Sequence, residues 1–220
     1  MGEMPDAESL SPERRARILE GAALVFARDG YEGASMAGIA REAAVSKGTL
    51  YNYYPGKSAL FGAHIERCAR ANLERIFDFP AEETDPATVL RRIGRAMVTM
   101  FLSPPARDLY RVVTAEATKF PEMARTFFAA GPEQGVRRLA AWLAGESGAG
   151  RLAVGDAEFA AEQFLALCQT RLALRYRLFL IERPAEAEIE RVIEGAIAMF
   201  LDHYAPPPRA AAPQEAERDG

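Results

Sequence analysis

The sequence has few cysteines and histidines and no long apolar run, and each shortage excludes a class of protein. Its 220 residues include two cysteines, Cys68 and Cys168, and two histidines. Each cysteine lies within an apolar helical pattern, so we expect both to be buried free thiols in a reducing cytoplasm. No apolar run reaches the roughly 18–20 residues that span a bilayer. The acidic first ten residues lack the basic and apolar regions of a secretory signal. These absences indicate a cytoplasmic protein.

Metal-binding and catalytic motifs are also missing. The chain has no CxxC, HExxH or Glu-x-x-His pair that would hold zinc or a di-iron centre. His64, Glu66 and Cys68 form an H-x-E-x-C string, but side chains two positions apart on a helix point in different directions. The segment GAGRLA at 148–153 satisfies a dinucleotide-binding pattern, yet no strand precedes it. We therefore expect no catalytic residue, no metal and no cofactor.

What the sequence does contain is helical periodicity. Hydrophobic residues make up 49% of the chain and charged residues 26%, which is typical of a globular protein with a substantial core. Apolar residues recur at spacings of three and four, β-alternation is absent, and Ser11-Pro12-Glu13 begins the first helix. We predict an all-α fold. The predicted helices cover 12–29, 35–43, 46–54, 57–79, 85–103, 106–119, 121–130, 132–146, 156–180 and 184–204.

Two short helices joined by a tight turn lie within residues 35–54, SMAGIAREAAVSKGTLYNYY. Ser35 caps the first, Ala43-Ala44-Val45 makes the turn, and Ser46 caps the second. This is the pattern of a helix-turn-helix, whose second helix enters the major groove of DNA. The same pattern also occurs on small helical bundles that bind no DNA, so the residues alone leave both interpretations open. The side chains expected to face outwards are Lys47, Thr49, Tyr51, Asn52 and Tyr53.

Residues 11–61 resemble the N-terminal domain of TetR-family (tetracycline-repressor-like) transcriptional regulators. The matching segment is RILEGAALVFARDGYEGASMAGIAREAAVSKGTLYNYYPGKSALF, and its densest part is VSKGTLYNYYPGKSAL. The resemblance implies that residues 46–53 form the recognition helix and that Tyr51, Lys57 and Ser35 touch phosphate. The DNA-binding residues expected on this basis are Ser35, Ser46, Lys47, Gly48, Thr49, Tyr51, Asn52, Tyr53 and Lys57.

Two residues depart from the pattern of that family. Ala44 stands where a glycine is common in the turn, and we expect a mild effect because alanine fits most turn geometries. Tyr54 stands where phenylalanine is usual, and we expect its hydroxyl to reach the rim of the core. A non-DNA-binding helical adaptor or small-molecule-binding protein is the alternative to a regulator.

From about residue 62 onwards, the middle helices hold bulky and soft side chains. The strings AEATKFPEMARTFF and GRLAVGDAEFAAEQFLAL are similar to the AefR-like C-terminal subgroup. The resemblance implies a pocket for a small apolar or amphipathic effector, since methionine-rich linings adapt to such ligands. Ordinary core packing is the alternative for each residue. The expected pocket residues are Phe61, His64, Cys68, Met97, Met100, Phe101, Phe127 and Trp142.

The last two predicted helices carry broad apolar faces that two chains could pair into a four-helix interface. Since one short recognition helix reads few bases, a homodimer on a palindromic operator is expected, although an intrachain core would produce the same pattern. The expected interface residues are Phe159, Phe164, Leu167, Leu172, Ile189, Ile193, Ile197 and Phe200.

The domain organisation follows from these segments and from the distribution of charge. We expect a disordered arm at 1–10, a helix-turn-helix domain at 11–56, a ligand-binding and dimerisation domain at 57–204, and a disordered tail at 205–220. The whole chain has a net charge of −4. Residues 11–75 instead contain 10 Lys and Arg against 7 Asp and Glu, a net charge of +3. The acidic balance therefore belongs to the rest of the chain, and a modest basic charge predicts a shallow salt dependence of DNA binding.

Overall fold

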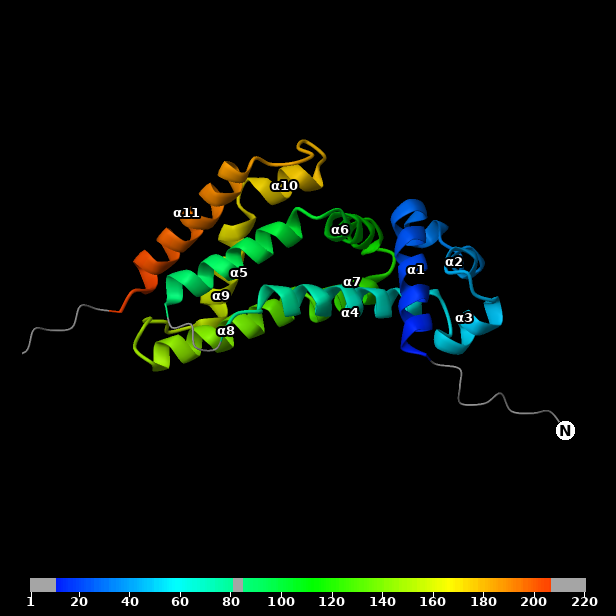
Figure 1. Cartoon of the computed structure of the whole chain (residues 1–220), viewed down its shortest axis with the longest axis horizontal. Coiled ribbons are helices and arrows are strands. Elements are labelled where there is room, and N and C mark those ends of the chain that lie inside the picture. The colour runs from blue at the N-terminus through cyan, green and yellow to red at the C-terminus, as the bar shows by residue number, and fades with distance from the viewer. Residues whose placement is uncertain (1–10, 81–84, 207–220) are drawn as a thin grey trace, which may run out of the picture.

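The computed structural model describes residues 11–80 and 85–206, and within these ranges the regular elements are all helices (Figure 1). This confirms the all-α prediction. The predicted N-terminal arm and most of the predicted tail lie outside the described residues. The helices are α1 (Pro12–Gly33), α2 (Met36–Glu42), α3 (Lys47–Tyr53), α4 (Lys57–Ile76), α5 (Pro86–Phe101), α6 (Pro104–Glu116), α7 (Pro121–Ala130), α8 (Pro132–Gly148), α9 (Ala157–Gln169), α10 (Leu172–Arg177) and α11 (Glu186–Tyr204).

Short polar side chains begin many of these helices, as the sequence predicts. A capping oxygen accepts a hydrogen bond from the backbone N–H three residues further on, which satisfies one of the N–H groups that the first turn leaves unpaired. A proline follows several caps, where its missing N–H costs nothing. Capping residues of this kind are Ser11, Ser35, Ser46, Asp85, Ser103 and Asp156.

The single helix predicted over 156–180 is wrong, because the chain breaks between α9 and α10. Arg171 has φ 65°, in the left-handed region that interrupts a right-handed helix.

The predicted stop at Asp29-Gly30 is a kink instead, since Gly30 has φ 73° and ψ 177° and α1 resumes for three more residues. Only glycine adopts this conformation readily. The kink brings Tyr31 into the core, where its ring packs against Phe61.

The buried side chains form two hydrophobic cores at opposite ends of the molecule. One core lies among α1, α2, α3 and the first half of α4, and the T-shaped pair Phe26–Phe61 lies within it. The other lies among α5, α8, α9 and α11, around the pair Phe164–Phe200. In Figure 1, α4 runs from the first group of helices to the second. Helix α4 is thus a structural link between the two ends.

The core at the α1–α3 end also includes side chains from much later in the chain. Val112 and Val113 of α6 and Met123 of α7 are buried in it. The packed unit therefore extends beyond the boundary at residue 56 that the sequence predicts. None of the described helices has the length and apolar character needed to cross a membrane.

Candidate DNA-binding surface and ligand cavity

Helices α1 and α2 cross at a point where only a residue without a side chain fits. A Cβ placed on Gly21 of α1 would lie 2.8 Å from the backbone nitrogen of Ala43 and 2.9 Å from its Cα. One turn before Ala43, Ile39 is fully buried, as is Leu50 of α3. Small residues at the crossing and large ones in the shared core fix the angle of the helix pair.

The turn between α2 and α3 is strained, which the sequence analysis did not expect. Ala44 has φ 51°, in the left-handed region where a Cβ approaches the carbonyl oxygen. That conformation costs roughly 1–2 kcal/mol for a residue other than glycine. The expectation that alanine is mild at this position is therefore wrong. The backbone N–H of Val45 donates to the carbonyl of Ala40, which holds the turn closed.

Ala44→Gly is expected to stabilise the protein by about 0.5–1 kcal/mol, because the left-handed strain that glycine removes outweighs the entropy that glycine adds to the unfolded chain. Urea unfolding of the two proteins measures this difference. Ala37→Gly is the control, since Ala37 lies within regular α2 and should lose a similar amount of stability. Equal stability losses in the two variants would contradict the assignment of strain to residue 44.

Helix α3 presents an exposed face and a buried face. Lys47, Gly48, Tyr51 and Asn52 are exposed, and Tyr51 keeps half of its surface open. The Ser46 hydroxyl accepts a hydrogen bond from the backbone N–H of Thr49 and lies 2.8 Å from the Thr49 hydroxyl. The exposed face agrees with the predicted DNA-contacting residues, and Thr49 is half-buried at its edge.

Two tyrosines next to this face are buried instead. Tyr53, expected to face outwards, is only 9% exposed, and its hydroxyl donates to the carbonyl of Ser11 at 3.4 Å. That prediction is wrong because a seven-residue helix places position 53 beside Leu50, on the core side. The prediction that the Tyr54 hydroxyl reaches the rim of the core is also wrong. The hydroxyl is buried and has no hydrogen-bond partner among the described residues. Burial raises the pKa of Tyr54.

Lys57 and Ser35 both have structural partners. The Lys57 ammonium donates to the carbonyls of Glu32 at 3.0 Å and Ala34 at 2.9 Å, and lies 4.8 Å from the centre of the Tyr31 ring. These bonds satisfy carbonyls at the end of α1, so two of the three N–H donors of the Lys57 ammonium are already used. The Ser35 side chain is exposed and accepts from the backbone N–H of Gly38. Both residues therefore hold the helix-turn-helix in shape, and any phosphate contact adds to that task.

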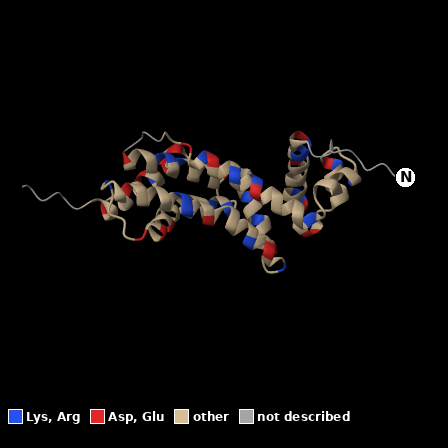
Figure 2. Ribbon diagram, turned by 90° about the horizontal axis from the view of Figure 1, so that it is seen from below, with Lys and Arg blue, Asp and Glu red and all other residues tan. Residues whose placement is uncertain are grey.

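Charge does not gather on one side of the molecule. Figure 2 shows basic and acidic residues interspersed along its whole length. This agrees with the modest net charge of residues 11–75, and the described residues show no broad basic face.

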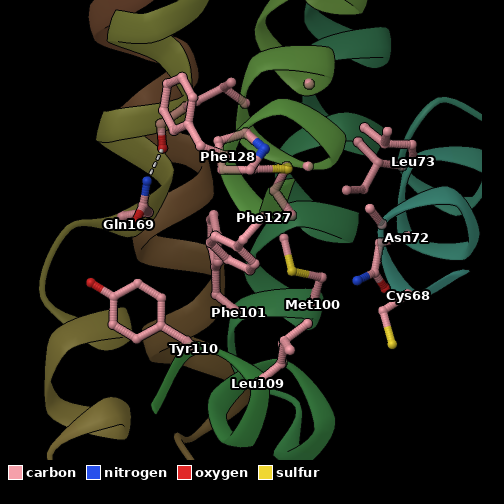
Figure 3. Close-up of a pocket in the computed structure, with 18 of the residues that line it drawn as sticks. Cys68, Asn72, Leu73, Met100, Phe101, Leu109, Tyr110, Phe127, Phe128 and Gln169 are labelled. Atoms are coloured by element: carbon pink, nitrogen blue, oxygen red, sulfur yellow. Dashed lines mark hydrogen bonds between the residues drawn. The ribbon is translucent and has the colours of Figure 1, made fainter. Parts of the chain in front are cut away.

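A cavity of about 440 Å³ lies among α4, α5, α6, α7, α8 and α9 (Figure 3). Its volume falls in the range of small-molecule sites. Five of the predicted pocket residues line it, namely Cys68, Met97, Met100, Phe101 and Phe127. Sequence reasoning missed its polar lining, which comprises Asn72, Arg107, Tyr110, Glu162, Gln169 and Arg177. One signal was available: Asn72 follows Cys68 by four residues and so shares its helix face.

Three predicted pocket residues lie elsewhere. Phe61 is buried in the core at the α1–α3 end, and Trp142 packs against Phe79 without lining the cavity. His64 is 7% exposed and packs against the rings of Phe26 and Phe61. Burial, with a smaller contribution from the Arg67 charge, lowers the pKa of His64 to about 4. His64 is therefore a neutral core residue near neutral pH.

The two thiols differ in their surroundings. Cys168 is buried as predicted, and burial raises its pKa to about 12. Cys68 is half-buried at the cavity wall, so the prediction of full burial is wrong for it. Within residues 11–80 and 85–206, no group of three or more His, Cys, Asp or Glu side chains is placed to hold a metal ion.

The predicted dimer residues mostly face inwards. Phe164, Leu172, Ile193, Ile197 and Phe200 are buried in the core of their own chain, so the prediction that they meet a second chain is wrong. The same periodicity serves intrachain packing here. Phe159 is exposed, and Leu167 and Ile189 are half-buried. Met199 of α11, which the sequence analysis did not single out, is also exposed.

Helix α6 joins the cavity to the helix-turn-helix end. Its first half lines the cavity through Arg107, Leu109 and Tyr110. Its second half packs on α1, where the Arg111 guanidinium donates to the carbonyl of Ala27 at 2.7 Å. Helix α6 therefore contacts both the cavity and α1.

Comparison with family models assigns both halves of the chain. Residues 18–64 match the model for bacterial regulatory proteins of the tetR family. Residues 88–206, more than half of the chain, match the AefR-like transcriptional repressor C-terminal domain.

Solved structures share the whole architecture. The Flavonoid-responsive Regulator FrrA is 33% identical, with a TM-score of 0.77, over 91% of this chain and 100% of that chain. A TetR-family transcriptional regulator from Mesorhizobium loti MAFF303099 has a TM-score of 0.81 over 91% of this chain and 100% of its own, at 23% identity. The second likeness shows the fold alone.

Curated relatives match over shorter stretches. The HTH-type transcriptional repressor KstR of Rhodococcus jostii (strain RHA1) is 36% identical over 67 residues, which are 30% of this chain and 32% of that protein. The HTH-type transcriptional regulator YuxN of Bacillus subtilis (strain 168) is 32% identical over 80 residues, 36% of this chain and 28% of that protein. The chain thus spans about a third of the length of these relatives.

Proposed function

The chain belongs to the TetR family of DNA-binding transcriptional regulators, and on that premise we propose that it is a homodimeric repressor released from a palindromic operator by a small-molecule ligand. The observation that carries the proposal is the position of α6, which lines the cavity with one half and contacts α1 with the other. Regulation, not catalysis, is the role of the family.

The proposed DNA contacts lie on the exposed face of α3. In this proposal Lys47 and Asn52 read base edges, Tyr51 meets the DNA backbone and Gly48 permits close approach, and the exposure of all four supports these roles. Ser35, Ser46, Thr49 and Lys57 support this face through the caps and carbonyl contacts described above. Tyr53 acts from the core side.

A dimer is proposed because one α3 of seven residues reads too few bases for a specific site. Two copies would read half-sites about 34–36 Å apart, and a palindrome supplies them. The exposed side chains Phe159 of α9 and Met199 of α11 support these two helices as the contact surface. In a dimer, both apolar side chains would be buried and removed from water.

Release by a ligand requires that the ligand prefer the state that does not bind DNA. A 100-fold weakening of operator affinity corresponds to about 2.7 kcal/mol of coupling between the two sites. Helices α4 and α6 both reach from the cavity to the α1–α3 end, so either can carry this coupling. FrrA is named flavonoid-responsive, and its likeness supports a ring-bearing organic effector for this cavity.

Lys47→Ala is expected to weaken operator affinity by about 30-fold or more, because a dimer loses one base or phosphate contact in each half-site. The operator is first obtained by selecting genomic fragments that the purified protein binds. Fluorescence anisotropy then compares wild type, Lys47→Ala and Tyr51→Ala, and the stoichiometry of the complex reports the dimer.

Arg92→Ala serves as the control, since it removes one exposed positive charge on α5 and should keep operator affinity within about twofold. Unchanged specific binding by both α3 variants, with folding intact, would rule out this reading face. Failure to select any specific fragment would favour the helical adaptor instead.

A further inference from the structure

One end of the cavity is lined by an arginine that has no acidic partner among residues 11–80 and 85–206. The Arg177 guanidinium carbon of α10 lies 4.0 Å from the centre of the Tyr110 ring and 5.6 Å from that of Phe101. One of its terminal nitrogens donates to the Gln169 side-chain oxygen at 3.4 Å. Since Tyr110, Phe101 and Gln169 all line the cavity, the guanidinium is part of its wall.

A second arginine lines the same cavity. The Arg107 guanidinium carbon lies 4.7 Å from the centre of the Tyr176 ring and 4.3 Å from that of Phe179, both at the α10 end. Its Nε is buried and has no hydrogen-bond partner among the described residues. The carboxylate of Asp108 lies 3.9 Å from that atom, beyond hydrogen-bond distance. Arg107 therefore retains an unused donor in a desolvated position.

Among the described residues, a carboxylate lies near only one of these two cations, since Asp108 is close to Arg107. Within the described residues, no carboxylate oxygen lies within 4.0 Å of the guanidinium nitrogens of Arg177. The carboxylate that lines the cavity belongs to Glu162, seven residues before Gln169 on α9, which is about 10 Å of helix rise. In Figure 3, Tyr110 and Gln169 lie on one side of the cavity and Asn72 and Cys68 on the other. The α10 end of the cavity is thus cationic, with Arg177 beside Gln169 and away from Glu162.

We propose that the effector is an amphipathic aromatic acid: its ring body packs on Phe101, Phe127 and Met100, and its carboxylate is bound by Arg177, with Arg107 adding positive charge. This inference rests on the proposed function, in which the cavity takes the effector. A carboxylate accepts two parallel N–H bonds from a guanidinium, a geometry that neutral phenols or amides cannot match. The long contact with Gln169 is the weak bond that the ligand replaces.

The test uses the full-length protein and a matched pair of probes, biphenyl-4-carboxylate and biphenyl-4-carboxamide. The two share one ring body and differ in charge. Titration calorimetry without DNA is expected to show that wild type prefers the acid by about 10-fold or more, as a charge-assisted hydrogen bond provides. Arg177→Gln should lose this preference, and Arg177→Lys should restore part of it.

Arg175→Gln is the matched control, because Arg175 lies on the same helix, pairs with Glu188 and does not line the cavity. It should keep the preference for the acid. Equal binding of the two probes to wild type, an unchanged preference in Arg177→Gln, or no binding of the acid up to millimolar concentration would each overturn the inference.

These outcomes are separate from those of the proposed function. Operator binding is measured without any probe. If the wild-type protein binds no operator, the proposed regulatory function is contradicted, but the preference of the cavity for the acid is not. If a neutral flavonoid releases the operator equally well from wild type and Arg177→Gln, ligand release stands and the anionic effector is rejected.

Discussion

Gly21→Ala is expected to destabilise the protein by about 3 kcal/mol and to abolish specific operator binding, because overpacking against backbone cannot be relieved by a rotamer change. The added Cβ would lie 2.8 Å and 2.9 Å from the backbone nitrogen and Cα of Ala43. Helix α2 must therefore move away from α1 and carry α3 with it. Urea unfolding and anisotropy with operator DNA measure the two effects.

Gly62→Ala provides the comparison. Gly62 lies within α4, and a Cβ there meets nothing within 4 Å. Alanine should therefore stabilise the helix by about 0.5–1 kcal/mol without changing operator affinity. A Gly21→Ala protein as stable as wild type would show that α1 and α2 do not cross this closely.

Acidification from about pH 7 to about pH 4.5 is expected to remove about 2.5 kcal/mol of stability through His64 alone. The folded-state pKa of His64 is about 4, below its value of 6.5 in the unfolded chain. The unfolded chain therefore binds a proton over this range while the folded protein does not, so stability falls as pH falls. The nearby charge of Arg67 also lowers the pKa of His64, because it repels the imidazolium.

His64→Gln isolates that contribution. Its stability should change with pH by about 2.5 kcal/mol less than that of wild type when urea unfolding is compared at the two pH values. Carboxylates with a lowered pKa, such as Asp85 and Glu194, stop stabilising the protein when they are protonated at more acidic pH. This loss affects wild type and His64→Gln equally. His203→Gln, at an exposed position near the end of α11, should behave as wild type. Identical pH profiles for wild type and His64→Gln would contradict a neutral buried imidazole.

Local signals made much of the fold predictable from the sequence. Caps such as Ser11, Ser35 and Asp85 act within one helical turn, so their effect is visible in a few residues. Breaks without glycine or proline carry no such signal. Arg171 and Ala44 both adopt positive φ although neither is glycine, and a sequence pattern gives no sign of that.

The candidate site was predictable where side chains project from one short, capped helix. Lys47, Tyr51 and Asn52 are exposed as predicted, but Tyr53 is not, because it lies three residues after the buried Leu50 and shares its face. Apolar spacing likewise cannot tell whether Phe200 packs within its own chain or against another. The cationic end of the cavity depends on Arg177, which reaches the site only because the chain breaks after α9.

The mixed origin of the core at the α1–α3 end limits how such proteins can be recombined. Val112, Val113 and Met123 complete a core whose other members precede residue 66. A chimera that joins a foreign DNA-binding segment at residue 56 keeps these three side chains but changes the helix beneath them. Exchange of operator specificity therefore requires matching the α1 surface that meets α6 and α7, whereas exchanging the exposed residues of α3 alone leaves that interface intact.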